Sequence, residues 1–406
     1  MKVLFVSEEF PFPLDTGGNV RTFHLLRALA SEHDVVLLCV DRPGLAAAQV
    51  EVVRRLVREV HLVERAAKGP AEELKALLRS LANGVPFILE RHRSRPLQRK
   101  FESLLKSGGF DAVHFNHLDA ALYADSVPAS LRTVLDQHNV VTNQVRTTIP
   151  TETRAIRRGV LRFDLPRLAA FETELCNRMR SCLVCSEQDA DYLKKMGVGA
   201  HSVVVPNGVD LDYFQMSAAL AGEPHLVFVG TLDYDPCEKG VWFFCNEVLP
   251  KIREKLPAVT FTAVGRNPSQ RLLKLRGAGS GIEFAGRVED LRPHVHAARV
   301  FVVPLLSGSG TRLKVLEAMA MGVPVVSTAI GAEGIAGTDG EHLRLGDTPE
   351  DFARAVLDVI GDDSLALRIR AGGRRLVERS YSWQEAGRRM LTVYTDVPAA
   401  RVAARV

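Results

Sequence analysis

Residues 299–328 constrain the fold of this chain more than any other stretch, because they combine a buried strand with a glycine-rich loop. Residues 300–303, Val-Phe-Val-Val, are β-branched and aromatic, which is typical of a buried strand. Pro304 ends this run. Residues 307–311, Ser-Gly-Ser-Gly-Thr, then predict a loop whose small side chains allow a ligand to approach the backbone closely.

A helix and a second strand follow this glycine loop. Residues 312–321 have helical composition, and residues 323–326 predict the next buried strand. Strand, loop, helix and strand form a βαβ unit, whose loop presents backbone N–H groups at the start of a helix. Such a helix start is a site for anions, most often phosphate. Glu317 lies further along the same helix, within reach of a ligand bound beside the loop.

Two cations stand where a helix dipole disfavours them. Arg312 and Lys314 lie near the predicted helix start, so their positive charge lowers stability there unless an anion binds. We therefore interpret both as candidate ligands of an anion. The alternative for Lys314 is a local ion pair with Glu317, three residues later on the same helix.

Length and composition indicate a two-domain globular protein. The chain has 406 residues, with 46% hydrophobic and 25% charged residues. Its apolar runs, such as residues 35–40, are too short to cross a bilayer. The N-terminus resembles a first strand more than a signal peptide. Six cysteines without framework spacing fit a reducing compartment, so we expect a cytoplasmic protein.

Strands and helices alternate in two successive runs. Parallel strands need helical crossovers, so this alternation predicts two doubly wound α/β domains, residues 1–200 and 201–381. The strands expected in the first run are residues 2–6, 35–40, 60–63, 112–115, 133–135 and 182–185, and the pattern restarts at residues 202–205. Those expected in the second run are residues 226–229, 260–264, 281–284, 299–303 and 323–326.

Small and polar residues follow several of these strands. Gly17 and Gly18 lie in the loop after the first strand, with Asn19 as the expected helix cap, while His117 and His138 each follow a later strand. Ligands of such sheets bind beyond the carboxyl ends of the strands, so one cleft between the domains could collect these residues and the glycine loop. The glycine pair lacks the full dinucleotide fingerprint, and either histidine could be purely structural.

The positive charge of the chain lies entirely in its first half. Residues 1–200 carry 28 Lys and Arg against 24 Asp and Glu, whereas residues 201–406 carry 24 of each. Residues 79–100 are strongly basic, with Glu90 as their one acid. This run predicts either a solvated face or contact with an anionic membrane surface or phosphorylated acceptor. Nucleic acid is disfavoured, because no aromatic stacking residues are interleaved with the arginines of residues 91–100.

Two short motifs suggest metal binding only weakly. Cys182 and Cys185 have CxxC spacing, but on a strand residues three apart point to opposite faces, so we expect a structural role. Residues 210–212 and 233–235 have the Asp-x-Asp pattern of some metal-dependent sugar transferases. Asp210 and Asp212 also suit a turn or helix start. We therefore expect no metal and no other cofactor.

Taken together, five segments resemble the family-4 retaining glycosyltransferases of the GT-B fold over nearly the whole chain. They are the glycine pair 17–18, VPNGVD at 205–210, GTLDY at 230–234, EFAGRVEDL at 283–291 and GTRLKVLEAMAMGVPVVST at 310–328. The last of these is the most specific. The resemblance implies two Rossmann-like domains facing a cleft, with a C-terminal helix at 382–395 that packs back on the first domain.

The resemblance also implies a nucleotide-sugar donor, held mainly by the second domain. Glu317 matches the glutamate expected to bind the ribose hydroxyls, and His117 matches the active-site histidine beside the donor sugar. The remaining donor contacts it implies are Gly17, Gly18, Gly308, Ser309, Gly310 and Thr311 at the diphosphate and Gly286, Arg287 and Val288 at the base.

Two departures from the family pattern bear on the donor. Ser309 stands where the family has its first motif glutamate, and Thr231 stands where an arginine is usual. The diphosphate then needs another cation, for which Arg312, Lys314 and Arg266 are the candidates.

The implied reaction is metal-independent transfer of a hexose-type sugar, with retention, to a glycan, lipid-linked or small-molecule acceptor in polysaccharide or glycoconjugate biosynthesis. Fixed cations and helix N–H groups would stabilise the leaving diphosphate, His117 would orient the sugar, and domain closure would exclude water. Two alternatives stay open. A nucleotide-sugar epimerase would need no acceptor, and a non-catalytic sugar-binding protein would usually be exported.

Overall fold

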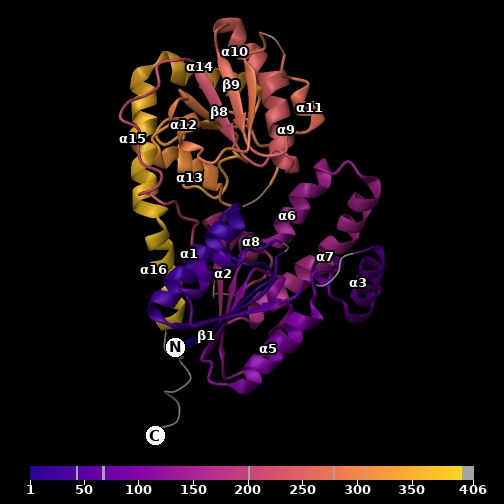
Figure 1. Ribbon diagram of the computed structural model, residues 1–406. Coiled ribbons are helices and arrows are strands. Elements are labelled where there is room, and N and C mark those ends of the chain that lie inside the picture. Colours follow the sequence, from indigo (N-terminus) through magenta and orange to yellow (C-terminus); the bar gives the residue numbers. More distant parts are fainter. Residues whose placement is uncertain (43, 66–68, 200–201, 278, 309, 396–406) are drawn as a thin grey trace. The chain divides into compact units, whose positions relative to one another are not determined.

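The computed structural model describes residues 1–42, 44–65, 69–199, 202–277, 279–308 and 310–395 (Figure 1). The chain divides into two compact units. Unit 1 comprises Met1–Val205 and the segment that begins at Gln384, and unit 2 comprises Pro206–Trp383. Each unit is built on a parallel sheet with helical crossovers. This confirms the fold class that the alternation of strands and helices predicts.

Unit 1 contains a seven-stranded parallel sheet in the order β3-β2-β1-β4-β5-β6-β7. Its strands are β1 Lys2–Ser7, β2 Asp34–Val40, β3 Glu59–Val63, β4 Ala112–Asn116, β5 Arg132–Asp136, β6 Ser181–Val184 and β7 Ser202–Val204. The central strands are almost wholly buried, because helices cover both faces of a doubly wound sheet. Strand order reverses between β1 and β4, which are paired in register from Val3 opposite Ala112 to Ser7 opposite Asn116.

The crossovers of unit 1 are mostly α-helices. They are α1 Gly17–Glu32, α2 Ala47–Arg54, α3 Pro70–Asn83, α4 Phe87–Glu90, α5 Arg95–Ser107, α6 Val141–Thr148, α7 Ala155–Arg178 and α8 Glu187–Lys195, with 3-10 turns at Ala120–Ser126 and Ile149–Thr151. Helix α16, Trp383–Thr395, returns to this unit. The Tyr394 hydroxyl lies 2.7 Å from Nδ1 of buried His114 on β4. Residues 280 positions apart are therefore joined inside one core.

Unit 2 contains a six-stranded parallel sheet in the order β10-β9-β8-β11-β12-β13. Its strands are β8 His225–Val229, β9 Thr260–Val264, β10 Ile282–Gly286, β11 Val300–Val303, β12 Val325–Ser327 and β13 Arg344–Leu345. Its helices are α9 Asp235–Phe243, α10 Leu249–Lys255, α11 Gln270–Leu273, α12 Arg292–His296, α13 Leu313–Ala320, α14 Pro349–Gly361 and α15 Asp363–Ser380, with a π-helical turn at Phe244–Val248. The sequence analysis missed β13, because two residues are too short for a periodic pattern.

Two predicted helix starts were wrong by a small margin. Helix α1 begins at Gly17, not after the glycine pair, and Thr16 is its cap: the Thr16 hydroxyl accepts from the Asn19 N–H at 3.2 Å. The expected cap, Asn19, therefore lies in the first turn of the helix. Helix α13 begins at Leu313, one residue later than predicted, with Arg312 at the cap position.

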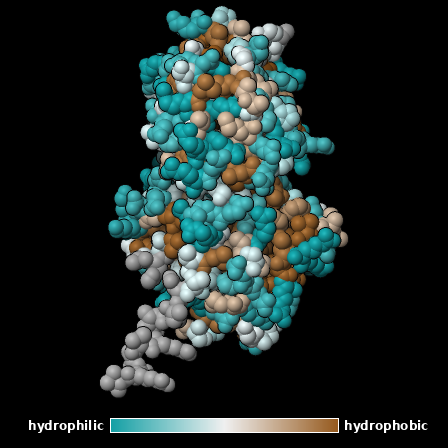
Figure 2. All heavy atoms as spheres, turned by 90° about the vertical axis from the view of Figure 1, so that its left-hand side faces the viewer, coloured by the Kyte–Doolittle hydropathy of each residue, from teal (hydrophilic) through white to brown (hydrophobic). Residues whose placement is uncertain are grey.

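The surface of the molecule is mostly polar where Figure 2 shows it. Hydrophilic side chains dominate this face, on which α15 lies, and hydrophobic ones are scattered among them (Figure 2). Within the described residues, no helix combines the length and the apolar character that a membrane span requires.

Candidate functional site

Each sheet reverses its strand order at one point, where ligands of doubly wound folds bind. In unit 1 this switch lies between β1 and β4, and in unit 2 between β8 and β11. The loops at the carboxyl ends of these strands contain most of the candidate residues from the sequence. Each unit therefore contains a candidate site of its own, the half-site of that unit.

The half-site of unit 1 is a polar pocket of about 260 Å³. It brings together three residues that the sequence analysis singled out: Gly18 from the first turn of α1, His117 after β4 and His138 after β5. Gly17 precedes Gly18 at the start of α1. The other lining residues are Ser7, Glu8, Glu9, Asn19, Thr22, Arg65, His92, Asn116 and Asp119.

His117 is held in an unusual backbone conformation. Its φ is 79°, in the left-handed region that non-glycine residues seldom adopt, and its N–H donates to the Asp136 carbonyl at 2.8 Å. Nδ1 lies 3.2 Å from Oδ1 of Asp119, and Nε2 lies 3.4 Å from Oδ1 of Asn139. Burial opposes its protonation, but the Asp119 carboxylate and these hydrogen bonds outweigh it and raise the pKa of His117 to about 9.

His138 has the opposite charge preference. Its ring lies 5.4 Å from that of His117 between centroids, in an edge-to-face arrangement. Its Nε2 is 3.1 Å from Oδ1 of Asn116. Burial and the positive charge of His117 lower the pKa of His138 to about 3, although the Asp136 carboxylate opposes this shift. At neutral pH His117 is therefore an imidazolium and His138 a neutral imidazole.

A buried ion pair supports both histidines. Arg21, on α1, and Asp136, at the end of β5, are 1% and 0% exposed, and their Nη2 and Oδ1 atoms lie 2.5 Å apart. Arg21 also donates to the Val205 carbonyl at 2.9 Å. Burial opposes ionisation of Asp136, but Arg21 outweighs it and lowers the pKa of this carboxyl. The sequence analysis missed Arg21, because an arginine on a helix is usually exposed.

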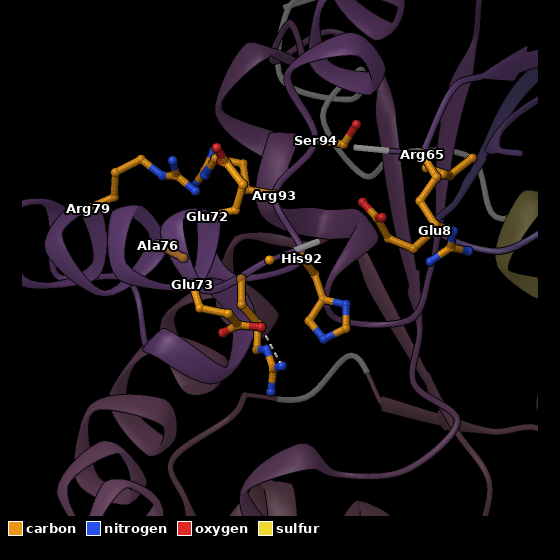
Figure 3. Close-up of a pocket in the computed structure, with 12 residues that line it drawn as sticks. Glu8, Arg65, Glu72, Glu73, Ala76, Arg79, His92, Arg93 and Ser94 are labelled. Atoms are coloured by element: carbon orange, nitrogen blue, oxygen red, sulfur yellow. Dashed lines mark hydrogen bonds and ion pairs between the residues drawn. The ribbon is translucent and has the colours of Figure 1, made fainter. Parts of the chain in front are cut away.

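A second pocket adjoins the first, since both are lined by Glu8, Arg65 and His92. Figure 3 shows Arg79 and Arg93 on one side of this pocket and Arg65 on the other, with His92 between them. Arg79 and Arg93 both contact the buried carboxylate of Glu90, at 2.9 and 3.0 Å. The basic run at 79–100 is thus partly a structural ion-pair cluster that fixes α3 against α4.

The half-site of unit 2 begins with three loops joined by backbone hydrogen bonds. Gly230 N–H donates to Val264 at 2.9 Å, and Gly265 N–H donates to Gly286 at 2.9 Å. A Cβ atom on Gly265 would lie 1.7 Å from the Gly230 carbonyl oxygen, so only glycine fits there. These contacts bring the predicted donor residues of the three loops to one edge of the sheet: Thr231, Arg266, Gly286, Arg287 and Val288.

The glycine loop after β11 has left-handed backbone at two positions. Gly308 has φ 117° and Gly310 has φ 81°, conformations that favour glycine. A Cβ on Gly308 would lie 2.6 Å from Nη2 of Arg312, so the arginine folds back over its own loop. Thr311 is buried, and its hydroxyl donates to the Gly334 carbonyl at 3.5 Å. Ser309 lies outside the described residues.

Lys314 reaches from α13 to the end of β8. Its Nζ lies 4.4 Å from the centroid of the Phe228 ring and 3.5 Å from Sγ of Cys237. A Cβ on Gly230 would lie 2.5 Å from the same Nζ. Among the described residues no salt bridge joins Lys314 to Glu317, although the charge of Lys314 still acts to lower the pKa of Glu317. The ammonium group is instead held at the switch point of the sheet.

The surroundings of Glu317 disfavour the charged form of its carboxyl group. Burial raises its pKa to about 7, and Lys314 only partly opposes this effect. Within the described part of the chain, the Glu317 side chain makes no hydrogen bond or salt bridge, whereas its backbone carbonyl accepts from the Met321 N–H at 3.0 Å. A ligand that donates hydroxyl groups would satisfy this carboxylate and restore its charge.

The candidate metal motifs have structural contacts instead. Cys182 Sγ lies 3.5 Å from the Cys176 carbonyl, and Cys185 Sγ lies 3.2 Å from that of His138. Asp210 caps a turn, accepting from the N–H groups of Asp212 and Tyr213 at 3.1 and 3.0 Å. No group of three or more His, Cys, Asp or Glu that could hold a metal ion occurs among the described residues.

Both halves of the chain match glycosyltransferase families. Residues 16–213 match Glycosyltransferase Family 4, and residues 223–362 match Glycosyl transferases group 1. The chain therefore belongs to the family-4, group 1 glycosyltransferases of the GT-B fold.

Similar proteins cover between 74% and 98% of the chain. A phosphatidyl-myo-inositol mannosyltransferase from Mycobacterium tuberculosis (strain CDC 1551 / Oshkosh) is 28% identical over 312 residues, covering 74% of this chain and 77% of the relative. A sucrose-phosphate synthase from Thermosynechococcus elongatus superposes with a TM-score of 0.67 at 18% identity, covering 97% and 98% of the two chains. Anabaena Alr3699/HepE in complex with UDP gives 0.68 at 15%, covering 98% and 100%.

Proposed function

We propose that this glycosyltransferase moves a hexose-type sugar from a nucleoside-diphosphate sugar to an acceptor hydroxyl, with retention of configuration. The observation that carries the proposal is Lys314, whose ammonium group is fixed at the switch point of unit 2 beside backbone that only glycine can form. A diphosphate is the ligand that such a combination of cation and exposed amides suits. The Anabaena protein of similar fold, which was crystallised in complex with UDP, supports a nucleotide donor.

In this proposal each part of unit 2 has a separate role toward the donor. Glu317 accepts hydrogen bonds from the ribose hydroxyls, which return its carboxyl to the charged form. The loop 308–311 and the cations Lys314, Arg312 and Arg266 bind the diphosphate. The loop 286–288 flanks the base. As the glycosidic bond breaks, negative charge grows on the diphosphate, and fixed cations stabilise it without reorganisation.

In this proposal the protonated imidazole of His117, in unit 1, acts as a hydrogen-bond donor toward the donor sugar. Held by Asp119, it donates a hydrogen bond to a sugar hydroxyl or to the leaving phosphate. Because it is protonated at neutral pH, it is unsuited to be the general base. We propose instead that a donor phosphate oxygen takes the acceptor proton, on the face from which the leaving group departs. No metal or cofactor enters this scheme.

The acceptor is proposed to bind in the two adjoining pockets of unit 1. A hydroxyl placed beside His117 leaves the rest of the molecule near Arg65 and His92, which line both pockets. These groups favour an acceptor with an anionic or hydroxyl-rich portion, such as a glycan, a lipid-linked sugar or a phosphorylated small molecule. The mycobacterial relative, a phosphatidyl-myo-inositol mannosyltransferase, supports the lipid-linked class.

We also propose a cytoplasmic location with peripheral contact at the inner face of the membrane. All six cysteines are buried free thiols, as a reducing compartment favours. The basic residues of the N-terminal half provide the attraction to an anionic surface.

A two-stage experiment tests the proposed function. A thermal-shift screen with UDP-, GDP- and dTDP-sugars should find one donor that raises the melting temperature, since a ligand that binds only the folded state stabilises it. The selected donor is then incubated with and without candidate acceptors. An acceptor-dependent glycosylated product with the donor's anomeric configuration is expected. A new nucleotide sugar formed from the donor alone would indicate an epimerase and contradict the proposal.

A further inference from the structure

Helix α3 of unit 1 presents its large apolar side chains to solvent and its small ones to the core. Leu74, Leu78 and Leu81 are 57%, 58% and 58% exposed. The buried residues of the helix are Ala76 and Ser80. Leucines at spacings of four and three residues form one stripe along a helix. An ordinary surface helix has the reverse arrangement, so this stripe requires an apolar partner.

Helix α7 carries a second stripe of the same kind in its first half. Ile156, Val160 and Phe163 follow the same spacing, and Ile156 is 87% exposed. With Leu77, these two helices contain seven of the sixteen large hydrophobic side chains that are exposed in the described residues. The concentration of apolar surface on two helices distinguishes this region from the scattered pattern expected on a soluble protein.

The two stripes belong to one continuous region of unit 1. Helix α4 packs between α3 and α7, where the Ile88 N–H donates to Asp164 of α7 at 2.9 Å. Arg167 of α7 in turn donates to the Ser80 carbonyl of α3 at 2.6 Å. Between α4 and α7 lies a mainly apolar hollow of about 670 Å³. This volume falls within the roughly 300–1,000 Å³ typical of small-molecule sites.

Positive charge surrounds this apolar region. Residues 70–100 and 151–167, which contain the helices and their flanks, carry 12 Lys and Arg against 5 Asp and Glu, whereas the whole chain has a net charge of only +4. Three arginines, Arg91, Arg154 and Arg157, line the hollow itself. Apolar stripes bordered by arginines are the composition of helices that lie in the interface of an anionic bilayer.

We infer that this region, the α3–α7 lipid surface, inserts into the headgroup layer of an anionic phospholipid bilayer. The apolar stripes of α3 and α7 enter the boundary between the headgroups and the acyl chains. The arginines contact lipid phosphates, and the hollow accommodates part of a lipid chain. A second copy of the chain fits less well, since a self-complementary contact would bring two strongly positive surfaces together. The inference rests on the membrane contact proposed above, and it does not require transfer to occur.

Vesicle flotation with the full chain tests the inference. The protein is mixed with phosphatidylcholine vesicles or with vesicles containing phosphatidylglycerol, and the double variant Leu78→Gln/Leu81→Gln is compared with Leu367→Gln. Leu367 is the matched control, because it is 54% exposed on α15 of unit 2. Glutamine retains helix propensity, so both variants should keep the wild-type melting temperature and donor binding.

The wild type and the Leu367→Gln control should bind anionic vesicles, and the double variant should bind about tenfold more weakly. Arg154→Gln/Arg157→Gln should weaken binding about tenfold and reduce its dependence on salt. The inference would be overturned if all variants floated equally with anionic vesicles. It would also be overturned if the wild type bound neutral and anionic vesicles equally well. So would a dimer in solution that the leucine variant dissociates, since a second copy would then cover the surface. If the wild type bound anionic vesicles but transferred no sugar, that result would instead count against the proposed function.

Discussion

The two units share a topology but build their half-sites by different means. In unit 1 the pocket depends on side chains: two histidines of opposite charge preference, a buried Arg21–Asp136 pair and the carboxylate of Asp119. In unit 2 the loops depend on backbone, with Gly230 and Gly265 in contact and left-handed residues at Gly308 and Gly310.

This difference follows from what each half-site is proposed to bind. A diphosphate has the same shape and charge in every donor, so amides and fixed cations recognise it without needing a tunable group. A sugar and its acceptor differ in the positions of their hydroxyls, which directed side chains distinguish. The comparison therefore predicts that unit 2 variants lower donor use most strongly, whereas unit 1 variants mainly change rate, pH dependence and acceptor choice.

The largest effect is expected in unit 2 from Lys314→Ala. Removal of a fixed cation that stabilises the leaving diphosphate should lower kcat about a hundredfold, and weaken donor binding in the thermal-shift assay. Lys251→Ala is the matched control, since this lysine of the same unit pairs with Glu350 on the surface. If Lys314→Ala transferred sugar at the wild-type rate, the diphosphate could not be assigned to this site.

Glu317→Gln should reduce transfer at least tenfold while stabilising the free protein at alkaline pH. The folded pKa of Glu317, about 7, exceeds its reference value of 4.5, so the unfolded chain releases this proton more readily. Stability therefore falls as pH rises from 4.5 through 7, and glutamine avoids that loss. Without donor, the variant should melt about 2–4 °C higher than the wild type at pH 8 and equally at pH 4. If Glu317→Gln melted below the wild type at pH 8, the conclusion that the surroundings disfavour the carboxylate would be wrong.

In unit 1, Asp119→Asn should change the pH profile more than the maximal rate. Asp119 raises the pKa of His117 from 6.5 to about 9, so the protonated histidine stabilises the fold below pH 6.5, and this contribution disappears as pH rises through 9. Asparagine can still cap the following turn, where Asp119 accepts from the Ala120 N–H at 2.9 Å. The alkaline limb of kcat should move down by about one pH unit, which is about a twofold loss at pH 8. An unchanged limb would exclude protonated His117 from the reaction.

The smallest effect is expected from Gly18→Ala. A Cβ at this position would meet the His138 ring at ordinary distances, with Nδ1 at 3.6 Å and Cε1 at 4.0 Å, and alanine is favoured in a helix. Stability should be unchanged or slightly higher, and KM for the donor should rise about threefold if a phosphate approaches the α1 backbone. Gly159→Ala is the control, since its Cβ would meet nothing within 4 Å. An unchanged KM would show that unit 1 does not contact the donor through this glycine.

Much of this architecture follows from the sequence alone. The β-branched runs and the helices between them predict two doubly wound parallel domains, because buried parallel strands leave a clear apolar signal. The motif at 310–328 predicts the glycosyltransferase family, which the comparisons confirm. Glycines such as Gly308 and Gly310 are visible in the sequence because their backbone conformation restricts the residue type directly.

The tertiary structure decided the charges of the side chains and their partners. That His117 is cationic and His138 neutral depends on Asp119, Asp136 and burial, which strands distant in the sequence provide. Lys314 approaches Phe228 instead of Glu317 because β8 lies beside β11. The exposed leucines of α3 are also a tertiary result, since helical periodicity identifies a stripe but only packing determines which stripe is buried. Electrostatics and burial depend on distances through space, and a sequence specifies these only once it has folded.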